Sequence, residues 1–184
     1  MKPNYDVGGI FFDENLGRQL SWMYAGIEST MKKDSSQACA LLLSTYTEVL
    51  GGFVTGKLKD PHSMRTNYEA FLPYLGEHYV NLHEKYDLYG IVRNKLVHEL
   101  SPRPSYIIWI RKSPQKDTFG IEIVDGTLNF NLQEYYRDFR NGIAKYREEF
   151  NRNGMRIINA MRVLEIEWQN VLHKPKDKKN KKRK

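Results

Sequence analysis

The sequence contains a single cysteine, Cys39, and a lone cysteine cannot form a disulfide within its own chain. It lies in the apolar segment QACALLLSTY, where we expect a small buried hydrophobic residue and not a nucleophile. No uninterrupted apolar run approaches the roughly 18 residues of a transmembrane helix, and the N-terminal segment lacks the features of a secretory signal. We therefore expect a soluble, cytoplasmic protein with no membrane partner.

Paired metal-binding side chains are also missing. The five histidines include no pair spaced by three or four residues, and no second cysteine can join them, so the sequence predicts no metal and no cofactor. The segment GGFVTGKL, from Gly51 to Leu58, imitates a phosphate-binding loop. However, Leu58 replaces the hydroxyl that would bind Mg²⁺, and the segment ends an apolar helix instead of joining a strand to a helix. We interpret it as a glycine-rich helix end.

The net charge of +7 comes entirely from the last eleven residues. The chain has 29 Lys and Arg and 22 Asp and Glu, of which eight basic residues and one Asp fall in this tail, so residues 1–173 are neutral. A tail of this composition, 174–184, is expected to be disordered. It is expected either to attract RNA phosphates or only to solubilise the protein. The basic residues that would contact RNA are Lys174, Lys176, Lys178, Lys179, Lys181, Lys182, Arg183 and Lys184.

Helical periodicity dominates the remaining 173 residues, which have the size of one domain. We predict helices in 15–33, in 38–54 as the most buried element, in 66–83 with bends or breaks at Pro73 and Gly76, and in 88–100. After Pro104 the pattern alternates over about 105–131, with a turn signal at Asp125–Gly126. From Leu132 the helical period returns for some forty residues, with a break expected at 151–154.

These patterns predict a mainly α fold. We expect a helical bundle, residues 1–173, with a small antiparallel β insertion at about 105–131 and the disordered basic C-terminal tail.

The segment LYGIVRNKLVHEL, Leu88 to Leu100, carries the strongest candidate site. On an ideal α-helix its apolar residues form one arc, and Asn94 and His98 share the opposite face. Arg93 falls at the edge of the arc, roughly 140° from His98. The Arg and the His therefore meet only if the long guanidinium sweeps round or the backbone departs from ideal geometry.

This segment resembles the signature of the HEPN superfamily of helical-bundle proteins, in which an Arg is followed by a polar residue and, four to six residues on, by a His. Arg93, Asn94 and His98 match those positions. The resemblance implies a metal-independent endoribonuclease, a toxin or antiviral effector, that acts as a homodimer with two facing motifs and can be held by an antitoxin or regulatory protein. Leu100 stands where members controlled by nucleotidylation carry a Tyr, which puts that control in doubt.

Cleavage of RNA requires side chains of the same types. Attack by the 2′-hydroxyl requires a base, an acid for the leaving oxygen, and positive charge beside the phosphate. His98 suits either proton role, Arg93 supplies the charge, and Asn94 can orient His98 or hold the phosphate. The alternative is a non-catalytic HEPN-like module that uses this face to dimerise or to bind a nucleotide or a protein.

Overall fold

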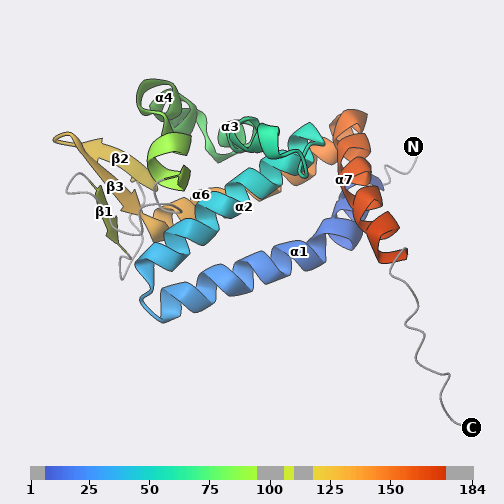
Figure 1. Cartoon of the computed structure of the whole chain (residues 1–184), viewed down its shortest axis with the longest axis horizontal. Helices are drawn as coiled ribbons and strands as arrows, with labels where there is room; N and C mark the ends of the chain where they lie inside the picture. Colours follow the sequence, from blue (N-terminus) through green and yellow to red (C-terminus); the bar gives the residue numbers. More distant parts are fainter. Residues whose placement is uncertain (1–6, 95–105, 110–117, 173–184) are drawn as a thin grey trace, which may run out of the picture.

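A computed structural model of the protein describes residues 7–94, 106–109 and 118–172 (Figure 1). The described helices and strands follow one another along the chain as α1 (Val7–Lys32), α2 (Ser36–Thr55), the 3-10 turn η1 (Pro61–Ser63), α3 (Met64–Leu75), α4 (Glu77–Tyr86), the π-helical turn η2 (Tyr89–Asn94), β1 (Tyr106–Trp109), β2 (Ile121–Val124), β3 (Thr127–Asn131), α6 (Leu132–Arg152) and α7 (Gly154–Leu172). The predicted mainly α class is confirmed.

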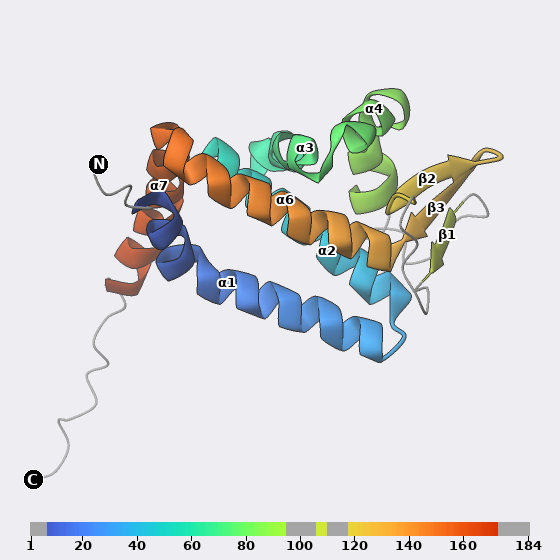
Figure 2. The same ribbon diagram turned by 180° about the vertical axis from the view of Figure 1, so that it is seen from behind.

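The long helices α1, α2 and α6 run side by side, the sheet lies beyond one end of them, and α7 crosses the other end (Figures 1 and 2). Their shared core is rich in aromatic rings. Phe12, Phe71, Tyr146 and Phe150 are all buried, and neighbouring rings meet edge to face at centroid distances of 5.1 to 6.2 Å. Edge-to-face contacts of this kind favour one arrangement of the helices over others with equal buried area.

Helix α2, which contains the stretch predicted to be the most buried, is the most apolar of the described helices. Cys39 and Leu43 near its start and Leu50 near its end are buried. Among the described helices, α2 alone is long and apolar enough to cross a membrane, and more than half of that stretch is buried inside the protein. The core helix of a soluble protein has the same properties.

Two glycines near the end of α2 allow other parts of the chain to pack unusually close, α3 at Gly51 and the turn after α2 at Gly52. A β-carbon at Gly51 would lie 1.5 Å from the backbone oxygen of Asn67 on α3, and one at Gly52 would meet Leu58. Gly56 then ends α2 in the left-handed region, with φ 72°. The segment that imitates a phosphate loop is thus a helix end, as predicted.

The predicted breaks at Gly76 and at 151–154 are confirmed, whereas Pro73 does not break the helix. Gly76, with φ 137°, separates α3 from α4, while Pro73 is accommodated inside α3. Asn153 lies between α6 and α7, within the predicted 151–154. Asn131 occupies the position before α6.

The β insertion has a mixed sheet, so the prediction of an antiparallel one is wrong in part. Strands β2 and β3 form the expected hairpin across Asp125 and Gly126, both at positive φ. Strand β1, however, pairs with β3 in parallel, in the order β1-β3-β2. Alternation in sequence gives the spacing of strands and not their order. The three strands still alternate in direction along the chain, and one pairing is parallel because β1 lies next to β3 and not next to β2.

Gly51→Ala should destabilise the protein by about 3 kcal/mol, because the methyl group must push α3 away from α2. Urea unfolding followed by circular dichroism measures the change. The matched control is Gly17→Ala in α1, where a β-carbon meets nothing within 4 Å. Alanine there should be neutral or stabilising by up to about 1 kcal/mol. Equal midpoints for the two variants would contradict the close packing of α2 and α3.

Candidate functional site

The first half of the candidate motif lies on η2, a π-helical turn that spans Tyr89–Asn94. Arg93 and Asn94 are partly buried there. Helix α4 ends at Asp87 in the left-handed region, with φ 50°, and the chain turns into η2. His98 and the basic tail residues fall outside the described residues. The structure therefore gives the surroundings of Arg93 and of the turn that carries it.

Arg93 forms an ion pair with Glu48 on α2. Its Nε donates to Glu48 Oε2 at 2.7 Å, and the two side chains are 15% and 13% exposed. The contact is made by Nε and not by the terminal NH₂ groups that bind phosphate oxygens in forked arginine contacts. Glu48 thus holds the guanidinium against α2 from one edge.

Sequence reasoning missed Glu48. Its only signal is that it is the one acidic residue within the otherwise apolar 38–54 stretch. A carboxylate in the middle of a core helix needs a cationic partner or hydrogen bonds to offset the loss of hydration. The sequence around Glu48 does not identify that partner, because Arg93 lies 45 residues further along the chain.

Asp87 fixes the start of the π-helical turn. Arg65 on α3 donates to its two carboxylate oxygens at 2.6 and 3.1 Å, and the Gly90 N–H donates to Oδ1 at 3.2 Å. The hydrogen bond from Arg65 lowers the pKa of Asp87 below its usual range. The carboxylate is therefore charged at neutral pH and ties the turn to α3.

Tyr89 connects this cluster to the core. Its buried ring packs edge to face on Tyr68 at 5.6 Å, and the Arg65 guanidinium lies over it at 5.0 Å. Burial, and secondarily the charge of Glu48, raise the pKa of Tyr89, whereas the charges of Arg93 and Arg65 lower it. Tyr89 is therefore a neutral phenol next to two cations.

His83 is a second imidazole in this neighbourhood, on α4. Its Nε2 lies 3.0 Å from Glu69 Oε1, and Glu69 also lies 3.8 Å from Arg65. Within the described ranges, no three His, Cys, Asp or Glu side chains gather as they would around a metal ion. The cluster is a network of hydrogen bonds and ion pairs on α3 and α4.

The predicted burial of Cys39 is confirmed, and burial raises the pKa of its thiol. A protonated, buried thiol is a poor nucleophile, which agrees with the structural role expected from sequence.

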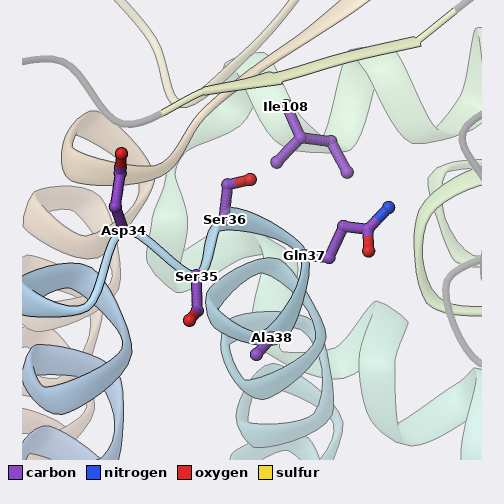
Figure 3. A pocket seen from close by; sticks show the side chains of 6 residues that line it. All are labelled: Asp34, Ser35, Ser36, Gln37, Ala38 and Ile108. Carbon is purple, nitrogen blue, oxygen red and sulfur yellow. The ribbon is translucent and has the colours of Figure 1, made fainter.

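A pocket of about 420 Å³ lies where β1 passes the start of α2. Figure 3 shows Ser36, Gln37 and Ile108 facing one another, while Ser35 and Asp34 point away. The lining side chains that the structure describes include no His, Lys or Arg, so they provide neither an imidazole nor a cation for phosphate chemistry.

A comparison of the chain with family models, with curated proteins and with solved structures gives no match.

Replacing Arg93 by Ala should lower the free energy of unfolding by about 1–3 kcal/mol, because Glu48 would keep a buried charge without its partner. Urea unfolding measures the loss. Glu48→Gln in the Arg93→Ala background should restore part of it, since a neutral amide costs less to bury.

The matched control is Arg147→Ala. Arg147 pairs with Asp13 at 2.6 Å, but these two side chains are 36% and 57% exposed. Its loss should cost less than about 1 kcal/mol. If Arg93→Ala cost no more than Arg147→Ala, the pair with Glu48 would not anchor the turn.

Proposed function

We propose that the protein is a metal-independent endoribonuclease of the HEPN type, in which Arg93 and His98 are catalytic and Asn94 supports them. It cuts RNA in the cytoplasm through the 2′-hydroxyl of the substrate, at a site shared by two chains of a homodimer. The observation that carries the proposal is the π-helical turn at Tyr89–Asn94, on which Arg93 is held by Glu48.

The π-helical turn supports the proposal because such turns are frequent at functional sites. It carries Arg93 and Asn94, two of the three residues of the motif. The residues that join them to His98 lie outside the described ranges.

The ion pair with Glu48 holds the Arg93 guanidinium in place, which supports a role in binding a phosphate. A guanidinium held by Nε loses little freedom when its terminal NH₂ groups bind phosphate oxygens. Electrostatic catalysis depends on charges that are already in place when the transition state forms. Arg65, beside the same turn, adds a second fixed cation to the neighbourhood.

The proposed reaction needs two proton transfers. His98 of one chain removes the proton of the 2′-hydroxyl, and the 2′-oxygen attacks the phosphorus. The bond from phosphorus to the 5′-oxygen breaks, and His98 of the second chain donates a proton to that oxygen. A 2′,3′-cyclic phosphate and a 5′-hydroxyl result, with Arg93 stabilising the charge on the phosphate oxygens. The tail, 174–184, gathers RNA, and an antitoxin or regulatory protein is the expected further partner.

One observation favours the alternative, a non-catalytic HEPN-like module that dimerises or binds a nucleotide or protein. The carboxylate of Glu48 neutralises Arg93 in the described structure, which weakens its attraction for a phosphate. A site used only to hold a helix in place would have this ion pair too.

Purified protein incubated with a folded RNA in EDTA should yield fragments that end in a 2′,3′-cyclic phosphate, detected by mass spectrometry. His98→Ala should lower the rate by about 10²- to 10⁴-fold, the usual contribution of a general acid or base. His62→Ala, at an exposed histidine of η1, is the matched control and should keep full activity. Intact RNA at high wild-type protein concentration would favour the binding module.

Mixing wild-type with excess His98→Ala chains, after subunit exchange, should depress activity below simple dilution, because each heterodimer keeps one histidine for two proton transfers. Cleavage rates at increasing ratios measure the effect. Activity in strict proportion to the wild-type fraction, or an active monomer in sedimentation, would falsify the shared site.

A further inference from the structure

A second pocket lies at the other end of α4 from η2. It has a volume of about 630 Å³ and opens where the junction of α3 and α4, the residues before β2, and α6 come together. Its described lining includes His78, Tyr79, Thr118, Phe119, Arg137 and Asp138. None of these residues belongs to the candidate motif. A volume in this range suits a small organic ligand.

One wall of the pocket is a stacked pair of rings. The Phe119 ring lies parallel to the His78 imidazole, with centroids 3.8 Å apart and an interplanar angle of 11°. His78 Nε2 lies 2.8 Å from the backbone oxygen of Ile121. Because a carbonyl oxygen only accepts, Nε2 carries a hydrogen and the imidazole is fixed. Phe119 is nevertheless 43% exposed. The imidazole covers one of its faces, so the exposed area belongs to the opposite face and the edge.

The floor of the pocket is polar and rigid. The Tyr79 hydroxyl donates to Asp138 Oδ2 and accepts from the Gly120 N–H at 2.9 Å. Arg137 Nε donates to Asp138 Oδ1 at 3.0 Å, and its Nη2 donates to the Thr118 backbone oxygen at 2.7 Å. Each carboxylate oxygen has two lone pairs, so Asp138 keeps the capacity to accept a further hydrogen bond. These contacts fix the floor before any ligand arrives.

Gly120 brings the residues before β2 against α6. A β-carbon at this position would lie 2.3 Å from the Cα of Tyr135, so only glycine allows the approach. The approach places the Gly120 N–H on the buried Tyr79 hydroxyl and Phe119 at the rim. The residues on either side of Phe119 are thus fixed by hydrogen bonds, Thr118 to Arg137 and Gly120 to Tyr79, and they hold the exposed ring in position.

We propose that this pocket binds a nucleobase, which stacks on the exposed face of Phe119. Aromatic side chains provide such stacking surfaces for unpaired bases. The carboxylate of Asp138 accepts a hydrogen bond from an exocyclic amino group, which favours cytosine, adenine and guanine over uracil. Arg137 lies beside the base, where the phosphate of the same nucleotide can approach. The base comes either from a single-stranded RNA or from a free mononucleotide.

The pocket is separate from the proposed cleavage site. Helix α4 has ten residues and rises about 15 Å between the pocket at its start and Asp87 at its end. A base held here belongs to a nucleotide away from the cleaved bond and contributes to substrate choice. The RNA source of the base rests on the proposed function, whereas base binding itself does not.

The test is a titration of the wild-type protein with the four ribonucleoside 5′-monophosphates and with a short single-stranded 2′-O-methyl RNA, followed by NMR or calorimetry. None of these ligands can undergo cleavage through a 2′-hydroxyl, so binding is measured apart from nuclease activity. Phe119→Ala should weaken binding by about 5- to 150-fold, the range expected for loss of one stacked base. Phe119→Tyr keeps the stacking face and should bind as wild type.

The matched control is Val124→Ala, at another exposed apolar residue, at the opposite end of β2 from Phe119, which should leave binding unchanged. Saturable binding of CMP or AMP that depends on Phe119 identifies a mononucleotide pocket. Phe119-dependent binding of the RNA alone identifies a base in a strand. Equal binding by the wild-type and Phe119→Ala proteins, or none at millimolar ligand, overturns the proposal. A protein that cleaves no RNA but binds these ligands through Phe119 would reject the nuclease and keep the pocket.

Discussion

The close approach of α2 and α3 at Gly51 is the constraint on which the candidate site depends. It seats α3 against the core helix, and α3 carries Arg65 and Tyr68, which hold Asp87 and Tyr89. Those two residues in turn fix the turn that presents Arg93 to α2. A side chain at Gly51 would move α3, and Arg93 would no longer meet Glu48 at 2.7 Å.

Glu48 is a charged residue in a core helix, and its ion pair with Arg93 has a structural role. A mostly buried ion pair often contributes little net stability, because both groups lose hydration, yet removing one partner is costly. Such a pair acts mainly as a geometric restraint. Here it ties the turn at Tyr89–Asn94 to α2, an element that is fixed independently by its buried Leu43 and Leu50.

Much of the helical fold could be predicted from the sequence, because apolar periodicity and single residues such as Gly76 and Asn153 act locally. The parallel pairing of β1 and β3 could not, since it depends on strand order in space. The π-helical turn and the partner of Arg93 could not be predicted either. The helical wheel assumes ideal α geometry, and Glu48 lies 45 residues away on another element. The sequence motif makes Arg93 a candidate, but only the structure shows that Glu48 holds it.

Helix α4 connects the pocket around Phe119 to the turn that carries Arg93. Its first turn contributes His78 and Tyr79 to the aromatic pocket, and its end leads through Asp87 into the turn that carries Arg93. Each end is fixed by a different neighbour, Asp138 of α6 at the start and Arg65 of α3 at the end. Helices α3 and α6 pack against α2 and against each other. The position of the pocket relative to Arg93 is therefore fixed before a ligand binds. Selection of a base and placement of a phosphate would then need no rearrangement of the bundle.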